Sequence, residues 1–590
     1  MIFTGRGFRF LFCFVLLSVL LAPSLFPLQF SDDGTPEDLA DAIEQAMSDD
    51  QALAQVFMLG WVGAEPSPLI MEWIRGRNIG GVKIFGWNTE DTIRLARTVG
   101  ALQEASLQGP FGIPLLVATD QEGGWIRHVK GSTSETPGNM AIGASGYPRD
   151  AYLAGYYIGE ELALLGINMN FAPTVDLFTN RRSELIGPRA FGSDPVNTGI
   201  LGAAFMKGQQ AAGVIPTAKH FPGHGDTELD SHGVLPSIDA DFKTLWEREM
   251  VPYRMLAAEG LPAVMSGHLA FPKARASMGG NDSAGDADSA GDADSTGDAD
   301  SGLNETAGTP ASLSPWFLKN ILREKIGYRG VIITDDLMMN GATLWAGSLS
   351  RTAKQALLAG NDIILFSKTP NLFDPVWTYL SNSMKDDGEF RLRVRDAARR
   401  TLEIKLRYLR GSQAVTYIPD LQKAENGLPN PEGSAFFLNL AARSVTVVKP
   451  EGGGQPEGAP AFPLKPEDAG KVLLTGQYLD FFKVGRAAFP GAVSYWYSEV
   501  FDINDLLSFA SRADTIVFCL SDAAGLRILR RFETFRKKVI VLSVLSPVYL
   551  ERVPWVERAV AVYSYAPESL AAGFSAITGR IPAGGKLPYE

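Results

Sequence analysis

Histidine is scarce in this sequence, yet three of its five histidines lie within thirteen residues. They are His220, His224 and His232, in a stretch that reads KHFPGHGDTELDSH from Lys219 onwards. The stretch is rich in Gly and Pro and follows an apolar run, so we expect a loop that leaves a strand. Polar side chains gathered in such a loop indicate a functional site more than a packed core.

Two chemistries could use this loop. In a metal site, His220, His224, Asp230 and His232 would supply nitrogen and oxygen ligands. Against a metal site, the Phe-Pro-Gly segment favours no helix that would hold the first two histidines on one face. The His-x-His pair that metal-dependent barrel hydrolases carry on their first strand is also absent. We therefore expect no metal.

The other chemistry is proton transfer. Asp230 and His232 are two residues apart, so both side chains point to the same side of an extended segment. A carboxylate can then hydrogen-bond one ring nitrogen and fix the tautomer. The second nitrogen is left to give or take a proton near neutral pH.

A reactive carboxyl that could work with this dyad is Asp335. It ends the β-branched run Gly330-Val-Ile-Ile-Thr-Asp335, which is typical of a buried strand. Asp336 follows directly and fits the cap of the next helix. Asp335 lies nearer the strand, where it could act as a nucleophile or as an electrostatic stabiliser.

Eight short apolar runs, separated by helical periodicity between residues 37 and 367, would position these side chains. The runs are Val56–Trp61, Gly81–Phe85, Leu115–Asp120, Met169–Asp176, Val214–His220, Ala263–His268, Val331–Asp335 and Asp362–Phe366. Eight βα units predict a (β/α)₈ barrel, whose active site lies at the C-terminal ends of its strands. Polar residues at those ends are Asp120, Asp176, Lys219, His220, His268 and Asp335.

Six further strand-like runs follow, alternating in part with helical segments. They are Ser444–Lys449, Lys471–Thr475, Val493–Tyr497, Thr515–Leu520, Val539–Val544 and Ala559–Tyr563. The predicted fold class is therefore α/β, with an N-terminal (β/α)₈ TIM-like barrel (37–411), a linker (412–432) and a C-terminal α/β sandwich domain (433–590). No Gly-x-Gly-x-x-Gly follows a strand, so we expect no dinucleotide and no other cofactor.

Charge and composition exclude some classes. The chain has 590 residues, with 66 acidic and 54 basic side chains and a net charge of −12, which argues against a nucleic-acid partner. Seven aspartates lie in the repetitive segment 279–307, which contains no Lys or Arg and which we expect to be a disordered acidic insert in the barrel. Its Asp-x-Asp spacing also suits calcium, but the ligand pattern of an EF-hand loop is absent.

Residues 1–30 are typical of an export signal. Arg6 and Arg9 precede an apolar centre from Phe10 to Leu21, and no acidic residue occurs before Asp32. We expect an exported protein, periplasmic or extracellular, that an uncleaved signal would hold at the membrane. Cleavage would leave Cys519 as the single cysteine, with no intramolecular disulfide.

Taken together, the motifs resemble glycoside hydrolase family 3, and within it the β-N-acetylglucosaminidase branch. The most specific segment is Lys219–Gly225 with Asp230-Ser-His232. Four others occur in the family's order: Asp120-Gln-Glu-Gly-Gly124, Phe171-Ala-Pro-Thr-Val-Asp176, Gly187-Pro-Arg-Ala-Phe-Gly192 and Thr334-Asp-Asp-Leu337. The resemblance covers about residues 56 to 366, and the ending Ile581-Pro-Ala-Gly-Gly-Lys-Leu-Pro588 resembles two-domain members more distantly.

The resemblance implies a retaining double displacement on a β-linked N-acetylglucosaminide. Asp335 would attack the anomeric carbon, and His232, oriented by Asp230, would protonate the leaving oxygen and later deprotonate water. Most retaining glycosidases use two carboxylates for these steps. A histidine can replace one of the two carboxylates because an imidazole on a loop titrates near neutral pH without being buried.

Sugar binding is implied for Asp120, Arg189, Lys219 and His220, through charge-assisted hydrogen bonds to hydroxyls. The family's arginine falls eight residues after Asp120, where this chain has His128, with Arg127 one position earlier. Either could take that place, and we include Arg127 among the expected binding residues. Asp176 and His224 are implied as supports of the barrel rim and loop, and we expect His268 to be a core histidine.

The implied partner is a carbohydrate, namely peptidoglycan fragments or chitooligosaccharides, and no stable protein partner can be inferred. Two alternatives stay open. One is a family 3 β-glucosidase, against which the Asp-Ser-His motif argues. The other is a carbohydrate-binding protein without activity, against which the intact Asp230, His232 and Asp335 argue.

Overall fold

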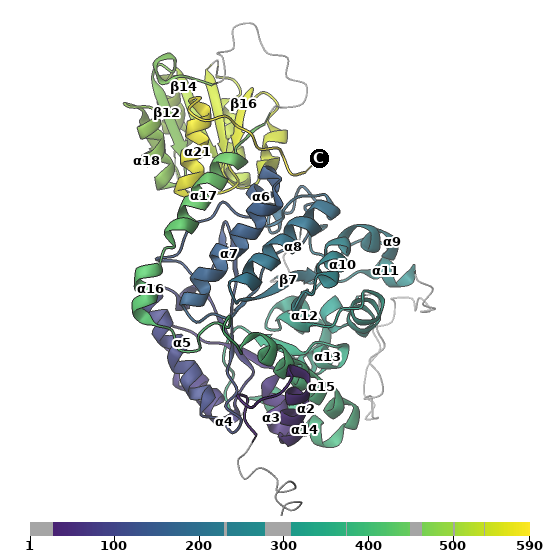
Figure 1. Cartoon of the computed structure of the whole chain (residues 1–590). Helices are drawn as coiled ribbons and strands as arrows, with labels where there is room; N and C mark the ends of the chain where they lie inside the picture. Colours follow the sequence, from purple (N-terminus) through teal and green to yellow (C-terminus); the bar gives the residue numbers. More distant parts are fainter. Residues whose placement is uncertain are drawn as a thin grey trace, which may run out of the picture.

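The computed structural model describes residues 28–228, 233–277, 308–372, 374–448, 463–498, 502–535 and 537–589 (Figure 1). Almost all of the predicted export signal, the acidic insert, and the dyad Asp230 and His232 therefore lie outside the described residues. Within the described part, no helix is both long enough and apolar enough to cross a membrane.

Eight parallel strands close into a barrel, in the order β1-β10-β9-β8-β7-β6-β3-β2. They are β1 (Phe57–Gly60), β2 (Gly81–Ile84), β3 (Leu116–Thr119), β6 (Met169–Asn170), β7 (Ile215–Phe221), β8 (Ala263–Ser266), β9 (Val331–Asp336) and β10 (Ile363–Phe366). Each matches one predicted run, which confirms the barrel.

The fourth barrel strand is shorter than predicted. The expected strand ran from Met169 to Asp176, but β6 ends at Asn170. Pro173 has no N–H to give to a ladder, and beyond it only Thr174 makes an isolated bridge, to Lys219 of β7. The segment nevertheless stays bonded to β7, because Ala172 accepts the Thr217 N–H and Val175 donates to the Lys219 carbonyl, each at 2.9 Å. It thereby carries Asp176 onto the rim of the barrel.

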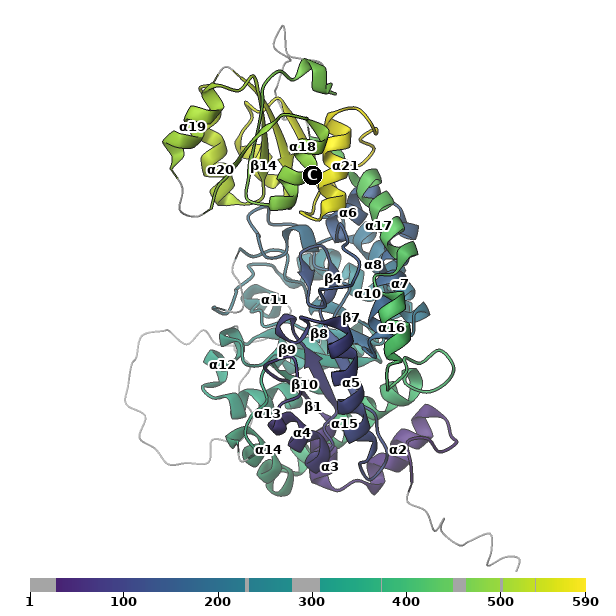
Figure 2. The same cartoon turned by 90° about the vertical axis from the view of Figure 1, so that its left-hand side faces the viewer.

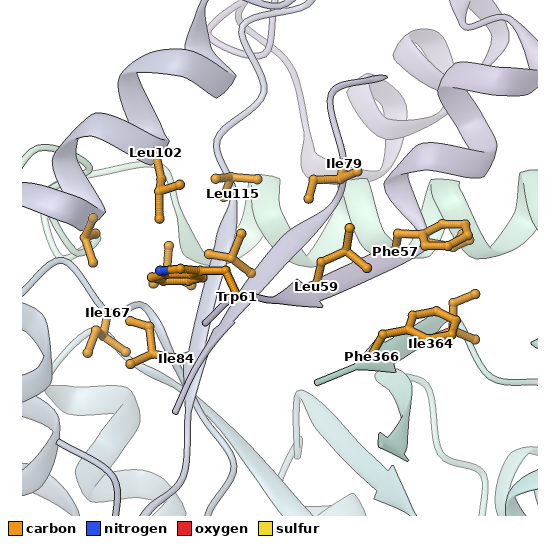
Figure 3. Packing of buried hydrophobic residues seen from close by; sticks show 14 of the residues in the cluster. Phe57, Leu59, Trp61, Ile79, Ile84, Leu102, Leu115, Ile167, Ile364 and Phe366 are labelled. Carbon is orange, nitrogen blue, oxygen red and sulfur yellow. The ribbon is translucent and has the colours of Figure 1, made fainter. Parts of the chain in front are cut away.

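Nearly every strand residue is buried, so both faces of the barrel sheet are covered. One cluster includes Met58, Ile333 and Leu365, and the other lies between the strands and the surrounding helices. Figure 3 shows Phe57 and Leu59 of β1 and Phe366 of β10 in this layer, with Leu102 of α5 (Thr92–Leu107). The rings of Phe57 and Phe366 stack with their centroids 5.7 Å apart. Each buried side chain of this size contributes about 1.5–3 kcal/mol to stability, so the strand ends are held firmly.

A six-stranded sheet forms the second domain, in the order β11-β16-β15-β14-β12-β13. Its strands are β11 (Thr446–Val448), β12 (Val472–Gly476), β13 (Val493–Trp496), β14 (Thr515–Leu520), β15 (Lys538–Ser543) and β16 (Arg558–Ala561). All pairs are parallel except β11 with β16. The six predicted runs and the mostly parallel sheet are confirmed.

Helices cover both faces of this sheet (Figure 2). On one face, α18 (Leu479–Ala488) and α21 (Pro567–Ile577) pack with Leu474, Val517 and Leu542. On the other, α19 (Ile503–Ser511) and α20 (Ala523–Leu529) pack with Leu473, Ile516 and Val541. Alternate strand residues thus point to opposite layers, which is the expected α/β sandwich.

The two domains are joined by helices and share a buried cluster. The stretch predicted as a linker, 412–432, contains α16 (Leu421–Gly427), and α17 (Pro431–Ser444) begins at its end. Figures 1 and 2 place α17 beside α6 (Asn139–Ser145) at the junction. The shared cluster joins Met140, Phe178, Ile186 and Ala190 of the barrel part to Tyr549, Leu550, Tyr563 and Tyr589 of the second domain.

Candidate active site

Asp120 is the centre of a charged cluster contributed by the barrel strands β2, β3 and β7 at one end of the barrel. It follows β3, and Lys83 of β2 lies 2.6 Å from its Oδ2. Lys219 of β7 contacts its other oxygen, Oδ1. Both lysine side chains are almost fully buried, whereas the Asp120 side chain is 17% exposed. The carboxylate is thus held by two cations and still open to a ligand.

Glu122 forms a second, deeper link in the cluster. It lies on the short hairpin β4 (Gln121–Gly123) and β5 (Ile126–Arg127). Its Oε1 is 2.6 Å from Lys219 Nζ, and Arg189 donates to both of its oxygens, at 2.9 and 2.8 Å. Burial would raise the pKa of Glu122, but Arg189 and Lys219 outweigh it and lower that pKa to about 2. The group is therefore ionised and orients both cations.

Burial and neighbouring carboxylates also have opposite effects on the pKa values of the two lysines. Burial would lower the pKa of Lys219, yet Asp120 and Glu122 raise it. For Lys83 burial prevails, and its pKa is lowered despite Asp120. Burial would likewise raise the pKa of Asp120, but Lys219 and Lys83 hold it well below its usual range. The cluster thus presents an ionised carboxylate beside N–H donors, a set that suits the hydroxyl groups of a sugar.

His128 lies beside Asp120, and Arg127 does not contact it. His128 Nδ1 is 3.2 Å from Lys83 Nζ and 3.7 Å from Asp120 Oδ2. Burial and then Lys83 lower the pKa of His128 to about 4, so its ring is neutral at neutral pH. The Arg127 guanidinium instead donates to the carbonyls of Thr133 and Ser134 and to Glu135, at 3.3, 3.2 and 3.1 Å. The β4–β5 hairpin thus directs these adjacent side chains to different partners.

Asp176 anchors the start of the histidine loop. Its Oδ2 is 2.7 Å from His220 Nδ1, and its Oδ1 accepts the backbone N–H of His224 at 2.7 Å. Burial would raise the pKa of Asp176, but the two histidines lower it to about 2. The His224 ring is buried without a hydrogen-bond partner among the described residues, and burial lowers its pKa to about 4. Asp176 therefore supports the loop, through the ring of His220 and the backbone of His224.

Asp335 lies at the C-terminal end of β9 and is partly exposed. Its Oδ1 accepts the backbone N–H of Asp336 at 2.8 Å. Burial would raise its pKa, but His220 and His268, then the Asp336 amide and Lys219, produce a net lowering. An ionised, accessible carboxylate can act as a nucleophile.

Asp336 and His268 have structural contacts near this carboxylate. Asp336 Oδ1 accepts the backbone N–H groups of Met338 and Ser367, each at 3.0 Å, which joins the ends of β9 and β10. The His268 ring is fully buried, 2.7 Å from the Ser312 hydroxyl and 3.1 Å from the Asp336 carbonyl oxygen. The burial of His268 matches the core histidine expected from the sequence. Asp336, however, does not cap the next helix, because α12 (Asn340–Ala346) has Met339 at its N-cap and Asp336 accepts N–H groups that lie outside the helix.

The structure brings Asp120, Arg189, Lys219, His220 and Asp335 to one end of the barrel, as the sequence predicts. His128, one of the two candidates that the resemblance left open, joins them, and so do Lys83 and Glu122, which were not predicted. A lysine inside the apolar run Gly81–Phe85 was a usable signal, because a buried lysine requires a partner. In the described part of the chain, no three His, Cys, Asp or Glu side chains are grouped so as to hold a metal ion, although two of the four candidate ligands lie outside it.

The chain is similar to several known proteins. The profile described as "Glycosyl hydrolase family 3 N terminal domain" matches residues 50–404. The chain is 31% identical over 398 residues to Beta-hexosaminidase A of Pseudoalteromonas piscicida, a match that covers 65% of this chain and 62% of that protein. It is 27% identical over 597 residues to the Beta-N-acetylglucosaminidase/beta-glucosidase of Cellulomonas fimi, covering 96% and 97%.

Among solved structures, the chain is similar to a glycoside hydrolase family 3 β-N-acetylglucosaminidase from Paenibacillus sp. str. FPU-7. The TM-score is 0.77 at 26% sequence identity, and the match covers 92% of this chain and 99% of that one. The similarity extends over both domains.

Proposed function

The chain belongs to glycosyl hydrolase family 3, and on that premise we propose that it is a β-N-acetylhexosaminidase that releases terminal β-linked N-acetylglucosamine. The observation that carries the proposal is the ionised, accessible Asp335 at the same barrel end as the Asp120–Lys219–Glu122–Arg189 cluster. Relatives named as β-hexosaminidases support this choice of sugar.

In the first proposed step, an Asp335 oxygen attacks the anomeric carbon of the bound sugar. The bond between that carbon and the leaving oxygen breaks, and a covalent glycosyl-enzyme forms. His232, oriented by Asp230, donates its proton to the leaving oxygen, so the aglycone departs as a neutral alcohol. The lowered pKa of Asp335 supports its part, because only the carboxylate is nucleophilic.

In the second proposed step, the now neutral His232 takes a proton from a water molecule. The water oxygen attacks the anomeric carbon from the face that the aglycone has left, and Asp335 departs as a carboxylate. Two inversions leave the released sugar in the β configuration. His232 is protonated again and ready for the next substrate.

Asp120, Lys219, Arg189 and His220 are proposed to bind the sugar. Asp120 would accept from hydroxyl groups, and the buried cations would donate to them and keep the carboxylates ionised. For the place of the family's arginine we propose His128, because its ring adjoins Asp120 and Lys83 while Arg127 is bonded to residues 133–135.

We further propose that the enzyme is exported, to the periplasm or the cell exterior, and acts there on peptidoglycan fragments or chitooligosaccharides. The N-terminal segment, with its basic start and apolar centre, supports export. A β-glucosidase activity is the second candidate, since the relative from Cellulomonas fimi is named for both activities.

Turnover of aryl glycosides tests the proposal. The purified protein, in the presence of EDTA, is expected to release the chromophore from an aryl N-acetyl-β-glucosaminide faster than from an aryl β-glucoside. Asp335→Asn is expected to lower kcat by more than about a thousandfold while the protein stays folded, because an amide cannot form the glycosyl-enzyme. Faster turnover of the glucoside would favour the second candidate, loss of wild-type activity in EDTA would favour a metal site, and no turnover of either glycoside would refute both glycosidase proposals.

A further inference from the structure

Residues 581–589 run from the second domain onto the barrel. Lys586 donates its backbone N–H to the Ala144 carbonyl of α6, at 3.0 Å. The Pro588 carbonyl accepts the backbone N–H of Ser193, also at 3.0 Å. The Tyr589 ring packs edge-on against Phe178, with centroids 5.2 Å apart. We call residues 581–589 the C-terminal strap.

At its other end the strap is fastened to the second domain. Gly585 donates its backbone N–H to the Val445 carbonyl at 2.9 Å, between α17 and β11. The fit is close, because a Cβ atom at Gly585 would lie 2.1 Å from the Ser444 carbonyl oxygen and 2.6 Å from Thr446 Oγ1. Neighbouring Gly584 has open space, with no atom within 4 Å of such a Cβ.

The barrel residues under the strap belong to the two segments that carry Asp176 and Arg189. Phe178, two residues after Asp176, donates its backbone N–H to the Gly192 carbonyl at 2.9 Å. A Cβ at Gly192 would lie 2.2 Å from the Pro588 carbonyl oxygen, so the strap sits directly on this loop. Asn139, in the helix that bonds the strap, donates from Nδ2 to the Arg189 carbonyl at 2.8 Å.

The second domain also contacts the barrel segment 178–193 through residues outside the strap. Tyr549 donates its hydroxyl to Glu184 at 2.7 Å, and Arg181 pairs with Glu551 at 2.7 Å. Ile186 and Ala190 are buried in the cluster shared by the two domains. The second domain therefore contacts the stretch from Phe178 to Ser193 at several points, although Arg181, Arg182 and Glu184 stay exposed.

We propose that the second domain is a positioning domain for the sugar site, and that the C-terminal strap locks the 187–193 loop so that Arg189 meets Glu122 with both of its N–H donors. Gly585 and Pro588 are then positioning residues that act through this loop. The inference rests on the proposed function, since Arg189 is assigned there to the sugar. A site with a loosened Arg189 binds the sugar less well, whatever the leaving group.

Three glycine-to-alanine variants of the full chain test the strap. Gly585→Ala forces the strap away from the second domain, Gly192→Ala forces it away from the loop, and Gly584→Ala is the matched control. None of the three glycines has a positive φ, so the contacts alone distinguish them. A Cβ atom at Gly585 would meet Ser444 and Thr446 of the second domain, so its effect on sugar binding would pass through the strap or through α17 and α6. Unchanged hydrogen exchange in peptides from α17 and α6 would assign the effect to the strap.

Both disrupting variants are expected to raise KM for an aryl N-acetyl-β-glucosaminide roughly tenfold, the effect of losing one charge-assisted hydrogen bond. Inhibition by free N-acetylglucosamine should weaken by the same factor, and kcat should change less. The loss in kcat/KM should be equal for good and poor leaving groups. Gly584→Ala should match the wild type.

Hydrogen exchange, measured by mass spectrometry on peptides covering 187–193, gives a readout that needs no activity. The Ser193 amide is bonded to the strap, so Gly585→Ala should speed its exchange while peptides from β1 and β10 keep wild-type protection. If Gly585→Ala equals Gly584→Ala in KM and in exchange of this loop, the strap has no positioning role. A wild-type protein that turns over no aryl glycoside would overturn the proposed function, and the exchange result would still decide on the strap.

Discussion

Glu122→Gln is the substitution that most directly probes the charged cluster. The side chain is 1% exposed and contacts Lys219 and both donors of Arg189. Glutamine has nearly the same shape but no charge. Lys83 and Lys219 would then still contact the carboxylate of Asp120, but Arg189 would lose the carboxylate that both of its donors contact.

Glu122→Gln is expected to lower the free energy of unfolding. The pKa of Glu122 is lowered from 4.5 to about 2 against the opposing effect of burial, which is equivalent to about 3 kcal/mol in favour of the charged form. Removing one partner of a buried ion pair typically costs about 3–5 kcal/mol. The glutamine oxygen still accepts one hydrogen bond, so we expect about 3 kcal/mol at pH 7.

The stability contributed by the charge of Glu122 decreases on acidification. The pKa of Glu122 in the folded protein lies below its unfolded value, so its stabilisation is complete above about pH 4.5 and is lost as the pH falls towards 2. The free-energy difference between wild type and Glu122→Gln should therefore shrink on acidification below pH 4.5. Urea unfolding of the barrel at several pH values measures it.

Glu104→Gln is the matched control, because Glu104 is an exposed residue of α5 and its substitution should change stability by less than about 0.5 kcal/mol. KM for the aryl glycoside should rise in Glu122→Gln, since Lys219 and Arg189 lose the group that orients them. A difference from wild type below about 1 kcal/mol at pH 7, or one that persists unchanged at pH 3, would mean that the charge of Glu122 does not stabilise the fold.

Two further substitutions test other parts of the molecule. Lys405 is fully buried and donates to Gln55 Oε1 at 2.9 Å. Burial lowers the pKa of Lys405 to about 7. Below that pH the buried side chain must be kept charged, which opposes folding. Lys405→Met should therefore raise the free energy of unfolding by about 2 kcal/mol at pH 6, after allowing for the unpaired Gln55, and the gain should shrink towards pH 10. His232→Ala should slow hydrolysis of glycosides with poor leaving groups by about 10²–10⁴-fold and of activated aryl glycosides much less, as measured by kcat/KM across a leaving-group series.

Each of these two substitutions has an outcome that would contradict the prediction. A Lys405→Met protein that is less stable at pH 6 than the wild type would mean that the lysine makes a favourable buried contact. Equal slowing of good and poor leaving groups by His232→Ala would remove His232 from protonation of the leaving oxygen.

Local sequence was enough to predict the framework of this protein. The barrel follows from eight apolar runs, because burial on both faces of a parallel strand leaves an uninterrupted apolar pattern. The same logic placed Asp335 at the end of β9, where the buried run stops at an acid. The motif around His220 indicated a functional loop for a local reason as well, since its residue types and spacing are read directly from the chain.

Only the tertiary structure decided which side chains meet. Lys219 and Asp120 are 99 residues apart in sequence, and their contact depends on the closure of the barrel. His128 rather than Arg127 adjoins Asp120 because the hairpin bonds Arg127 to the chain beyond it. The strap contacts the barrel because the second domain packs against Phe178, Ile186 and Ala190 of the barrel part. Such contacts depend on distances between elements remote in the chain, which residue types and local periodicity do not contain.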